Sequence, residues 1–133
     1  MYQILKKQTL NANTKLMVID APHVARKAEP GQFIILRVDA DGERIPLTIA
    51  DFDREKGAVT IIFQEVGATT MALGALSEGD CLHDFVGPLG KASEFDGMHK
   101  VAVVGGGLGC AIAYPQAKKL HELGCQVDLI AGF

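Results

Sequence analysis

The sequence predicts a mainly β protein, in which a small antiparallel barrel or sandwich is followed by one βαβ unit. Short apolar segments separated by turn residues fill the first hundred positions, a pattern typical of small antiparallel folds. Glycine is unevenly distributed: 3 of the 15 glycines lie in residues 1–66 and 12 in residues 67–133, where we expect turns and close backbone approaches. The pattern changes near residue 97, so we expect two parts, residues 1–97 and 98–133.

The first part contains five short segments with strand character. The strongest is residues 58–66, a run of β-branched and aromatic residues that opens after Lys56-Gly57. The others are bounded by turn signals such as Pro30-Gly31 and Gly87-Pro88. Residues 69–76 are expected to form a helix whose threonines cap its start. The expected strands are residues 14–19, 32–38, 46–50, 58–66 and 80–86.

The second part has the pattern of parallel β structure. Residues 100–104 form a continuous apolar run, as in strands that are buried on both faces. A glycine-rich turn at residues 105–109 leads into an expected helix at 110–123, which Gly124 ends, and a strand follows at 126–131. One such unit has two exposed sheet edges, so we expect a truncated α/β nucleotide-binding domain that self-associates when the chain is isolated.

Composition excludes several classes of protein. The chain carries 13 basic and 16 acidic side chains, a net charge of −3, which argues against nucleic-acid binding. No apolar run approaches the ~20 residues that cross a bilayer. The first ten residues lack the apolar core of a signal peptide. We therefore expect a cytoplasmic protein with no nucleic-acid partner and no membrane partner.

The cysteines give no sign of a disulfide framework or a metal site. There are three, Cys81, Cys110 and Cys125, and none of their spacings is a CxxC. We expect three reduced and mostly buried thiols, since free cysteine is usually buried.

The glycine-rich turn is the first candidate for a binding site. Between an apolar strand and a helix, glycines let a phosphate approach the amides of a helix N-terminus. The turn departs from the GxGxxG pattern because Cys110 stands where its third glycine would be. The alternative is a tight turn that serves only packing.

Two further segments have residues suited to a phosphorylated ligand. Arg44 precedes an expected strand, and an arginine fork pairs well with a pyrophosphate; the alternative is a solvated turn residue. Thr48 can present a hydroxyl to a flat heterocycle from that strand. The run Gly67-Ala68-Thr69-Thr70 can form a second phosphate cradle, or it can be a simple N-cap.

Five motifs occur in an order that resembles the ferredoxin–NADP reductase superfamily. They are ERIPLTIAD at 43–51, VGATT at 66–70, EGD at 78–80, GPLG at 87–90 and VAVVGGGLGCAIAYPQAK at 101–118. The resemblance is greatest to the flavin- and iron–sulfur-containing small subunit of NADH-dependent ferredoxin–NADP oxidoreductase and sulfide dehydrogenase, and to the electron-transfer subunit of dihydroorotate dehydrogenase. It covers essentially the whole chain. It implies a six-stranded antiparallel FAD-binding barrel followed by the first βαβ unit of an NAD(P)-binding domain.

The resemblance also implies roles for individual residues. The family's Arg-x-aromatic/apolar-Ser/Thr flavin motif falls on residues 45–48, with Ile45 at the arginine position and Arg44 one residue earlier. Thr48 would lie near N5 of the flavin and is the candidate catalytic residue. The cofactor-binding residues would be Arg44, Pro46, Leu47, Thr48, Ile62, Phe63, Gln64, Gly67, Thr69 and Thr70 for FAD, with Gly105, Gly106, Gly107 and Gly109 for the nicotinamide dinucleotide.

These roles imply an electron-transfer function. The parent protein would pass electrons between NAD(P)H, FAD and a ferredoxin or iron–sulfur centre, beside a larger catalytic subunit, whereas these 133 residues alone would be inactive. The family's [2Fe–2S] cysteine cluster has no counterpart here and is expected only further along the chain, so no metal ligands are predicted. Two alternatives stay open: a flavin-free barrel acting as a binding or regulatory module, and a dinucleotide-dependent dehydrogenase with an unrelated N-terminal cap.

Overall fold

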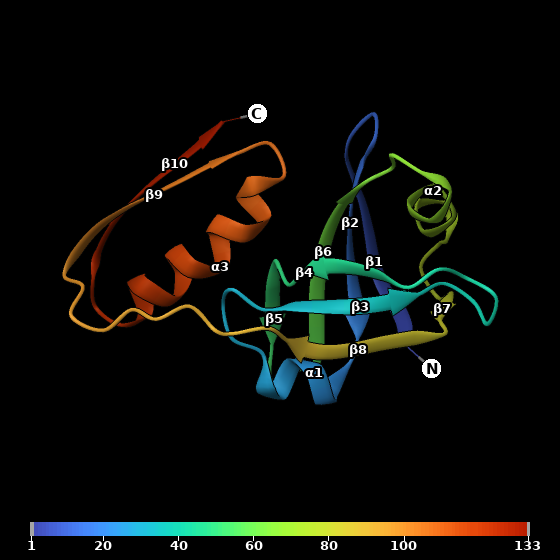
Figure 1. Ribbon diagram of the computed structural model, residues 1–133, viewed down its shortest axis with the longest axis horizontal. Helices are drawn as coiled ribbons and strands as arrows, with labels where there is room; N and C mark the ends of the chain where they lie inside the picture. Colours follow the sequence, from blue (N-terminus) through green and yellow to red (C-terminus); the bar gives the residue numbers. More distant parts are fainter. Residues whose placement is uncertain (1, 133) are drawn as a thin grey trace.

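The computed structural model describes residues 2–132, which form two antiparallel sheets followed by a βαβ unit (Figure 1). One sheet has five strands in the order β5-β6-β2-β1-β7, and the other has three in the order β4-β3-β8. The elements of the first part are β1 (Tyr2–Asn11), β2 (Thr14–Asp20), α1 (Pro22–Lys27), β3 (Phe33–Arg37), β4 (Ile45–Thr48), β5 (Asp51–Asp53), β6 (Ala58–Gln64), α2 (Ala68–Ala75), β7 (Cys81–Leu82) and β8 (Asp84–Leu89). The βαβ unit comprises β9 (Lys100–Gly106), α3 (Gly109–Glu122) and β10 (Gln126–Gly132).

The mainly β class is confirmed, but the closed six-stranded barrel is not seen in residues 2–132. The chain instead passes between the two sheets through α1, between β2 and β3, and at two corners, one between β4 and β5 and the other between β7 and β8. At the first corner, the amide of Ile49 donates to Gln32, beside β3, while the next amide, of Ala50, donates to Thr60 in β6. Two successive amides thus donate hydrogen bonds toward different sheets, as expected where a strand bends from one sheet into the other.

A single hydrophobic core lies between the two sheets. Its largest fully buried side chains include Phe63 of β6, Met17 of β2, Ile34 of β3 and Phe85 of β8. Along β6, Val59, Ile61 and Phe63 are buried, while the residues between them are half-buried. This alternation follows from the period of two in a strand, and it leaves the other face of β6 available to a ligand.

Most expected elements are confirmed, with three omissions. The sequence gives little sign of β1. In the structure Ile4 is the only buried residue among its ten, so the strand has no alternating apolar pattern. α1 has six residues and begins at Pro22, because proline suits the first position of a helix. β5 has only three residues.

The strand expected at residues 80–86 is divided in two and runs further than expected. His83 separates β7 from β8 at the second corner, and β8 continues through Gly87-Pro88 to Leu89. The proline is tolerated because β8 is an edge strand, which has one side free of ladder hydrogen bonds. The boundary predicted at residue 97 lies between the end of β8 and the start of β9 and stays a prediction.

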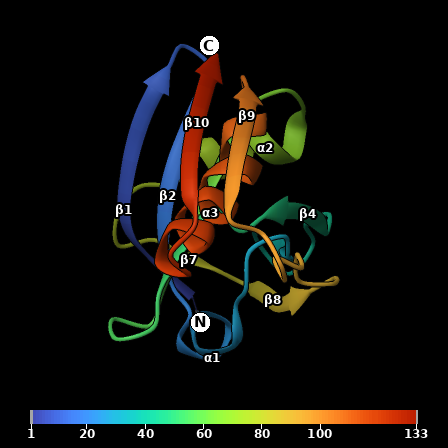
Figure 2. The same cartoon turned by 90° about the vertical axis from the view of Figure 1, so that its left-hand side faces the viewer.

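The βαβ unit forms as expected, but its strands are covered on one face only. β9 and β10 pair in parallel from Lys100 with Gln126 to Gly106 with Gly132. Figure 2 shows both strands in front of α3, which lies between them and the rest of the molecule. Val104, Leu129 and Ile130 are 69%, 50% and 56% exposed, which agrees with the expectation that a single βαβ unit leaves apolar strand surface uncovered.

An ion pair joins α3 to the first part of the chain. Lys118 Nζ donates to Asp51 Oδ1 at 2.8 Å, between α3 and β5. This hydrogen bond raises the pKa of Lys118 above its ordinary value, and partial burial of the ammonium only partly opposes it. Lys118 therefore keeps its charge at neutral pH, and the ion pair helps to hold α3 against the sheet.

The expectation of mostly buried thiols was wrong. All three cysteines are free, but Cys81 is exposed, and Cys110 and Cys125 are half-buried. In the two-residue strand β7 it is Leu82 that enters the core, so the neighbouring Cys81 faces outward. Across residues 2–132, no helix is long and apolar enough to cross a membrane.

Candidate functional site

A cavity of about 440 Å³ lies where the βαβ unit meets the first part of the chain. Ile62 and Gln64 line it from the half-buried face of β6, and Gly107 lines it from the turn before α3. Residues more than forty positions apart in the sequence are thereby brought to one space. The lining comprises Leu10, Asn11, Thr14, Ile62, Gln64, Gly107, Leu108, Cys110 and Ala111.

A second cavity, of about 320 Å³, lies along β4. It is lined by the three predicted flavin-contacting residues, Pro46, Leu47 and Thr48, together with Gly31 and Phe33. The pairing of Thr48 with Phe33 across β4 and β3 fixes the position of the threonine. One apolar surface with a single hydroxyl at its end suits a flat aromatic ligand.

Phe63 differs from its neighbours on β6. Its side chain is 1% exposed and lies in the hydrophobic core, on the opposite face of the strand from Ile62 and Gln64. Any contact of Phe63 with a cofactor would therefore be through its backbone.

The segment from Gly67 to Thr70 begins α2. Gly67 is the N-cap residue. Thr70 Oγ1 accepts hydrogen bonds from the backbone amides of Gly67 and Val66, at 3.0 and 2.9 Å. The threonines thus lie within the first turn rather than at the cap position that we expected. Thr69 Oγ1 donates instead to Glu43 Oε2 at 3.0 Å, in the loop before β4. Glu43 was not among the predicted residues, although it begins the ERIPLTIAD run.

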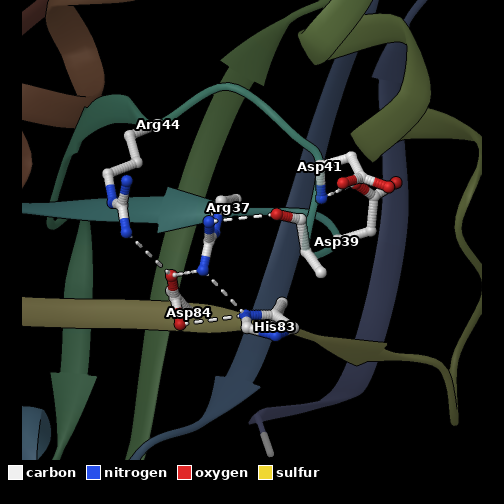
Figure 3. A network of polar contacts seen from close by, with 7 residues as sticks. Arg37, Asp39, Asp41, Arg44, His83 and Asp84 are labelled. Carbon is white, nitrogen blue, oxygen red and sulfur yellow. Dashed lines mark hydrogen bonds and ion pairs between the residues drawn. The ribbon is translucent and has the colours of Figure 1, made fainter.

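Arg44 lies in a network of charges between β3 and β8 (Figure 3). Its Nη2 is 3.8 Å from Asp84 Oδ2, which Arg37 Nη2 approaches more closely, at 2.8 Å. His83 Nδ1 lies 3.0 Å from the other carboxylate oxygen of Asp84. Arg44 is 65% exposed in its side chain, so its long contact with Asp84 is weak and leaves its charge available to another anion.

Asp84 is held in its ionised form. Burial is the largest single influence on the pKa of Asp84 and raises it, but the hydrogen bond with His83 and the charges of Arg37 and His83 together outweigh it. The pKa of Asp84 therefore lies below its ordinary value. Sequence reasoning did not find this network, since it joins β3 to a strand about fifty residues further on.

The glycines of the turn before α3 have different surroundings. Gly105 and Gly106 belong to β9, so the strand runs further than the expected 100–104. A side chain on Gly105 would meet Cys110 Cα at 3.0 Å, so this glycine permits close packing of strand and helix. Gly107 has φ +55°, a conformation that favours glycine. Gly106 and Gly109 face open space, where a ligand can approach the backbone.

Comparison with known proteins relates this architecture to a family. Residues 1–93 match the model of the oxidoreductase FAD-binding domain. A solved structure of NADH-dependent reduced ferredoxin–NADP oxidoreductase, described for flavin-based electron bifurcation, has a TM-score of 0.95 and 40% identity over 98% of this chain and 48% of that chain.

Two curated relatives are similar over nearly the whole chain. A Clostridium beijerinckii protein from the adh 3′ region is 53% identical over 99% of this chain and 47% of its own length. A Thermotoga maritima homologue of the electron transfer subunit of dihydroorotate dehydrogenase B (NAD(+)) is 42% identical over 98% of this chain and 46% of its own length. The chain therefore spans about half the length of these curated relatives.

The fold and the family match define the FAD-binding part of a protein of the ferredoxin reductase superfamily, as the sequence motifs predicted. The chain belongs to the oxidoreductase FAD-binding domain family.

Proposed function

We propose that this chain binds FAD in the two cavities and at the start of α2, and passes electrons between NAD(P)H, FAD and an iron–sulfur centre or ferredoxin. The match of residues 1–93 to the FAD-binding family is the observation that carries the proposal. The domain limits 1–97 and 98–133 form part of it. The glycines at 105, 106, 107 and 109 would receive the nicotinamide dinucleotide.

The residues that line the two cavities and those at the start of α2 fit the two chemical parts of FAD. Pro46, Leu47 and Ile62 offer apolar contact to the flat isoalloxazine, and Thr48 offers a hydroxyl. The pyrophosphate suits the start of α2, where unpaired amides and the helix dipole favour an anion. Arg44 has the exposed charge to approach it.

FAD supplies the conversion between a two-electron hydride and single electrons. The chain's own residues would orient the ring and exclude water from it. Thr48 would donate or accept a hydrogen bond at the reacting edge of the ring, and for this reason we propose it as the catalytic residue. Its place at the end of β4, paired with Phe33, gives it a fixed position for that role.

The relatives suggest the partners. The Thermotoga maritima relative is described as a homologue of an electron transfer subunit of dihydroorotate dehydrogenase B (NAD(+)), and a subunit belongs to a larger assembly. We therefore propose a larger catalytic subunit as partner, with ferredoxin or an iron–sulfur centre as acceptor. In this proposal, a [2Fe–2S] centre and most of the NAD(P)H site belong to the other half of a longer protein.

The absorbance spectrum of the freshly purified chain tests the central proposal. A flavin spectrum, with FAD released on denaturation, is the expected result. A colourless protein that does not bind added FAD would contradict it and favour a flavin-free binding or regulatory module.

Replacing Thr70 with valine is expected to weaken FAD binding about tenfold without unfolding the chain. The variant loses the hydroxyl that accepts the amides of Val66 and Gly67, so the loop that enters α2 is no longer fixed. Fluorescence titration with FAD measures the change, and Thr70→Ser, which keeps the hydroxyl, is the matched control. Unchanged flavin content in the valine variant would remove Thr70 from the site.

The isolated 133 residues are expected to self-associate through β9 and β10. Their outer face exposes Val104 and Ile130, which pair across the two strands, and burial of each such side chain stabilises by about 1.5–3 kcal/mol. Light scattering over a range of concentrations measures the mass, and Ile130→Lys is expected to shift it toward the monomer. A monomer at every concentration would refute this proposal.

A further inference from the structure

Glu43 occupies the place beside α2 where an anionic ligand would be expected. Its carboxylate accepts a hydrogen bond from Thr69 Oγ1 at 3.0 Å, although the two residues are 26 positions apart. Glu43 lies in the loop between β3 and β4 and is exposed, so no packing in the core holds it there. The hydrogen bond to Thr69 is the contact that ties its carboxylate to α2.

The start of α2 attracts negative charge. The first amides of a helix have no partner within the helix, and its dipole places partial positive charge at this end. Thr69 belongs to this first turn and is a half-buried residue. A carboxylate here has the same kind of interaction that the pyrophosphate of FAD would have.

The hydroxyl of Thr69 can serve only one of these two anions at a time. A threonine hydroxyl has a single proton and so donates a single hydrogen bond. While it donates to Glu43, it cannot donate to a phosphate oxygen. A phosphate that replaced Glu43 would also lie near the displaced carboxylate, whose charge has the same sign.

The adjacent arginine does not offset this charge at α2. Glu43 contacts Thr69, whereas Arg44 is directed toward Asp84 on β8 (Figure 3). Of these two neighbouring residues, the acidic Glu43 contacts the helix, and the basic Arg44 contacts a different element. The charged group in contact with Thr69 is therefore the negative one, that of Glu43.

We propose that Glu43 is an internal competitor for the pyrophosphate of FAD and sets the affinity of the site for phosphorylated flavins. The inference rests on the proposed FAD function and adds to it a specificity-determining residue. Binding of FAD then includes an exchange at Thr69, in which a phosphate oxygen replaces the carboxylate of Glu43 as the acceptor.

Affinity for two flavins tests the proposal. We expect Glu43→Ala to lower the Kd for FAD about fivefold, because the competing acceptor and its charge are removed. Riboflavin has the same ring but no phosphate, so its Kd should not change. Asp41→Ala is the matched control, since it removes one negative charge from the same loop at an exposed residue whose side chain makes no recorded contact with Thr69. Its effect on FAD should stay within about twofold.

A second pair of variants tests the exchange at Thr69 itself. In a Thr69→Val background, the gain from Glu43→Ala should fall from about fivefold to about twofold, because the two acceptors no longer share a donor. Unfolding midpoints of all variants should match that of the parent chain, since these side chains lie outside the core.

The outcomes separate this inference from the proposed function. A parent chain and a Glu43→Ala variant that both fail to bind FAD would overturn both. FAD binding that is unchanged or weaker in Glu43→Ala would overturn the competition alone. Equal gains for FAD and riboflavin, or a full fivefold gain without the Thr69 hydroxyl, would overturn it as well.

Discussion

Replacing Phe63 with alanine is expected to destabilise the folded chain by about 3–5 kcal/mol. The side chain is fully buried between the two sheets, and its removal leaves a cavity that its neighbours fill only in part. Urea unfolding followed by circular dichroism measures the loss. Most small domains have only about 5–15 kcal/mol of stability, so a loss of this size takes a large share of the total.

Two further variants separate the core from the proposed flavin site. Phe63→Leu keeps most of the volume and should cost about 1–1.5 kcal/mol while FAD binding persists. Ile62→Ala removes the neighbouring side chain on the cavity face and should weaken FAD binding while costing less stability than Phe63→Ala. A larger loss of stability in Ile62→Ala than in Phe63→Ala would contradict the assignment of the two faces of β6.

With FAD bound, the 133 residues are expected to oxidise NADH at least about 100-fold more slowly than a full-length relative. Hydride transfer requires the nicotinamide to be held against the flavin, and poor positioning alone has a cost of this order. The βαβ unit contributes one glycine-rich turn to that task, and the Gly107 amide there already donates to the carbonyl of Gly132 at 2.8 Å.

Two measurements make this expectation decisive. Chemical reduction of the bound flavin with dithionite should proceed normally, which shows that the cofactor is competent. The rate of NADH oxidation is then compared with that of the full-length Thermotoga maritima relative under the same conditions. Flavin-dependent NADH oxidation by the 133 residues at a comparable rate would refute the expectation.

The sequence by itself determined the elements whose signals are local. The apolar run after Lys56-Gly57 forms β6, and the helix expected before the stop signal Gly124 forms α3. The parallel pairing of β9 and β10 also follows from a strand, a glycine-rich turn, a helix and a second strand in sequence. Such signals can be read from the sequence alone, because hydrophobic periodicity and turn-forming residues act over only a few positions. The order of five motifs likewise indicated the superfamily, which the comparisons confirmed.

Only the tertiary structure decided which residues meet. β1 has one buried residue, so its strand depends on pairing with β2 rather than on its own pattern. At the corner of Ile49 and Ala50, the two adjacent amides donate hydrogen bonds toward different sheets, and nothing in the local sequence indicates this. The neighbours Glu43 and Arg44 likewise contact different elements, α2 and β8. These contacts join residues far apart in the chain, and loop conformation sets them, so no local pattern records which charge lies beside the proposed cofactor site.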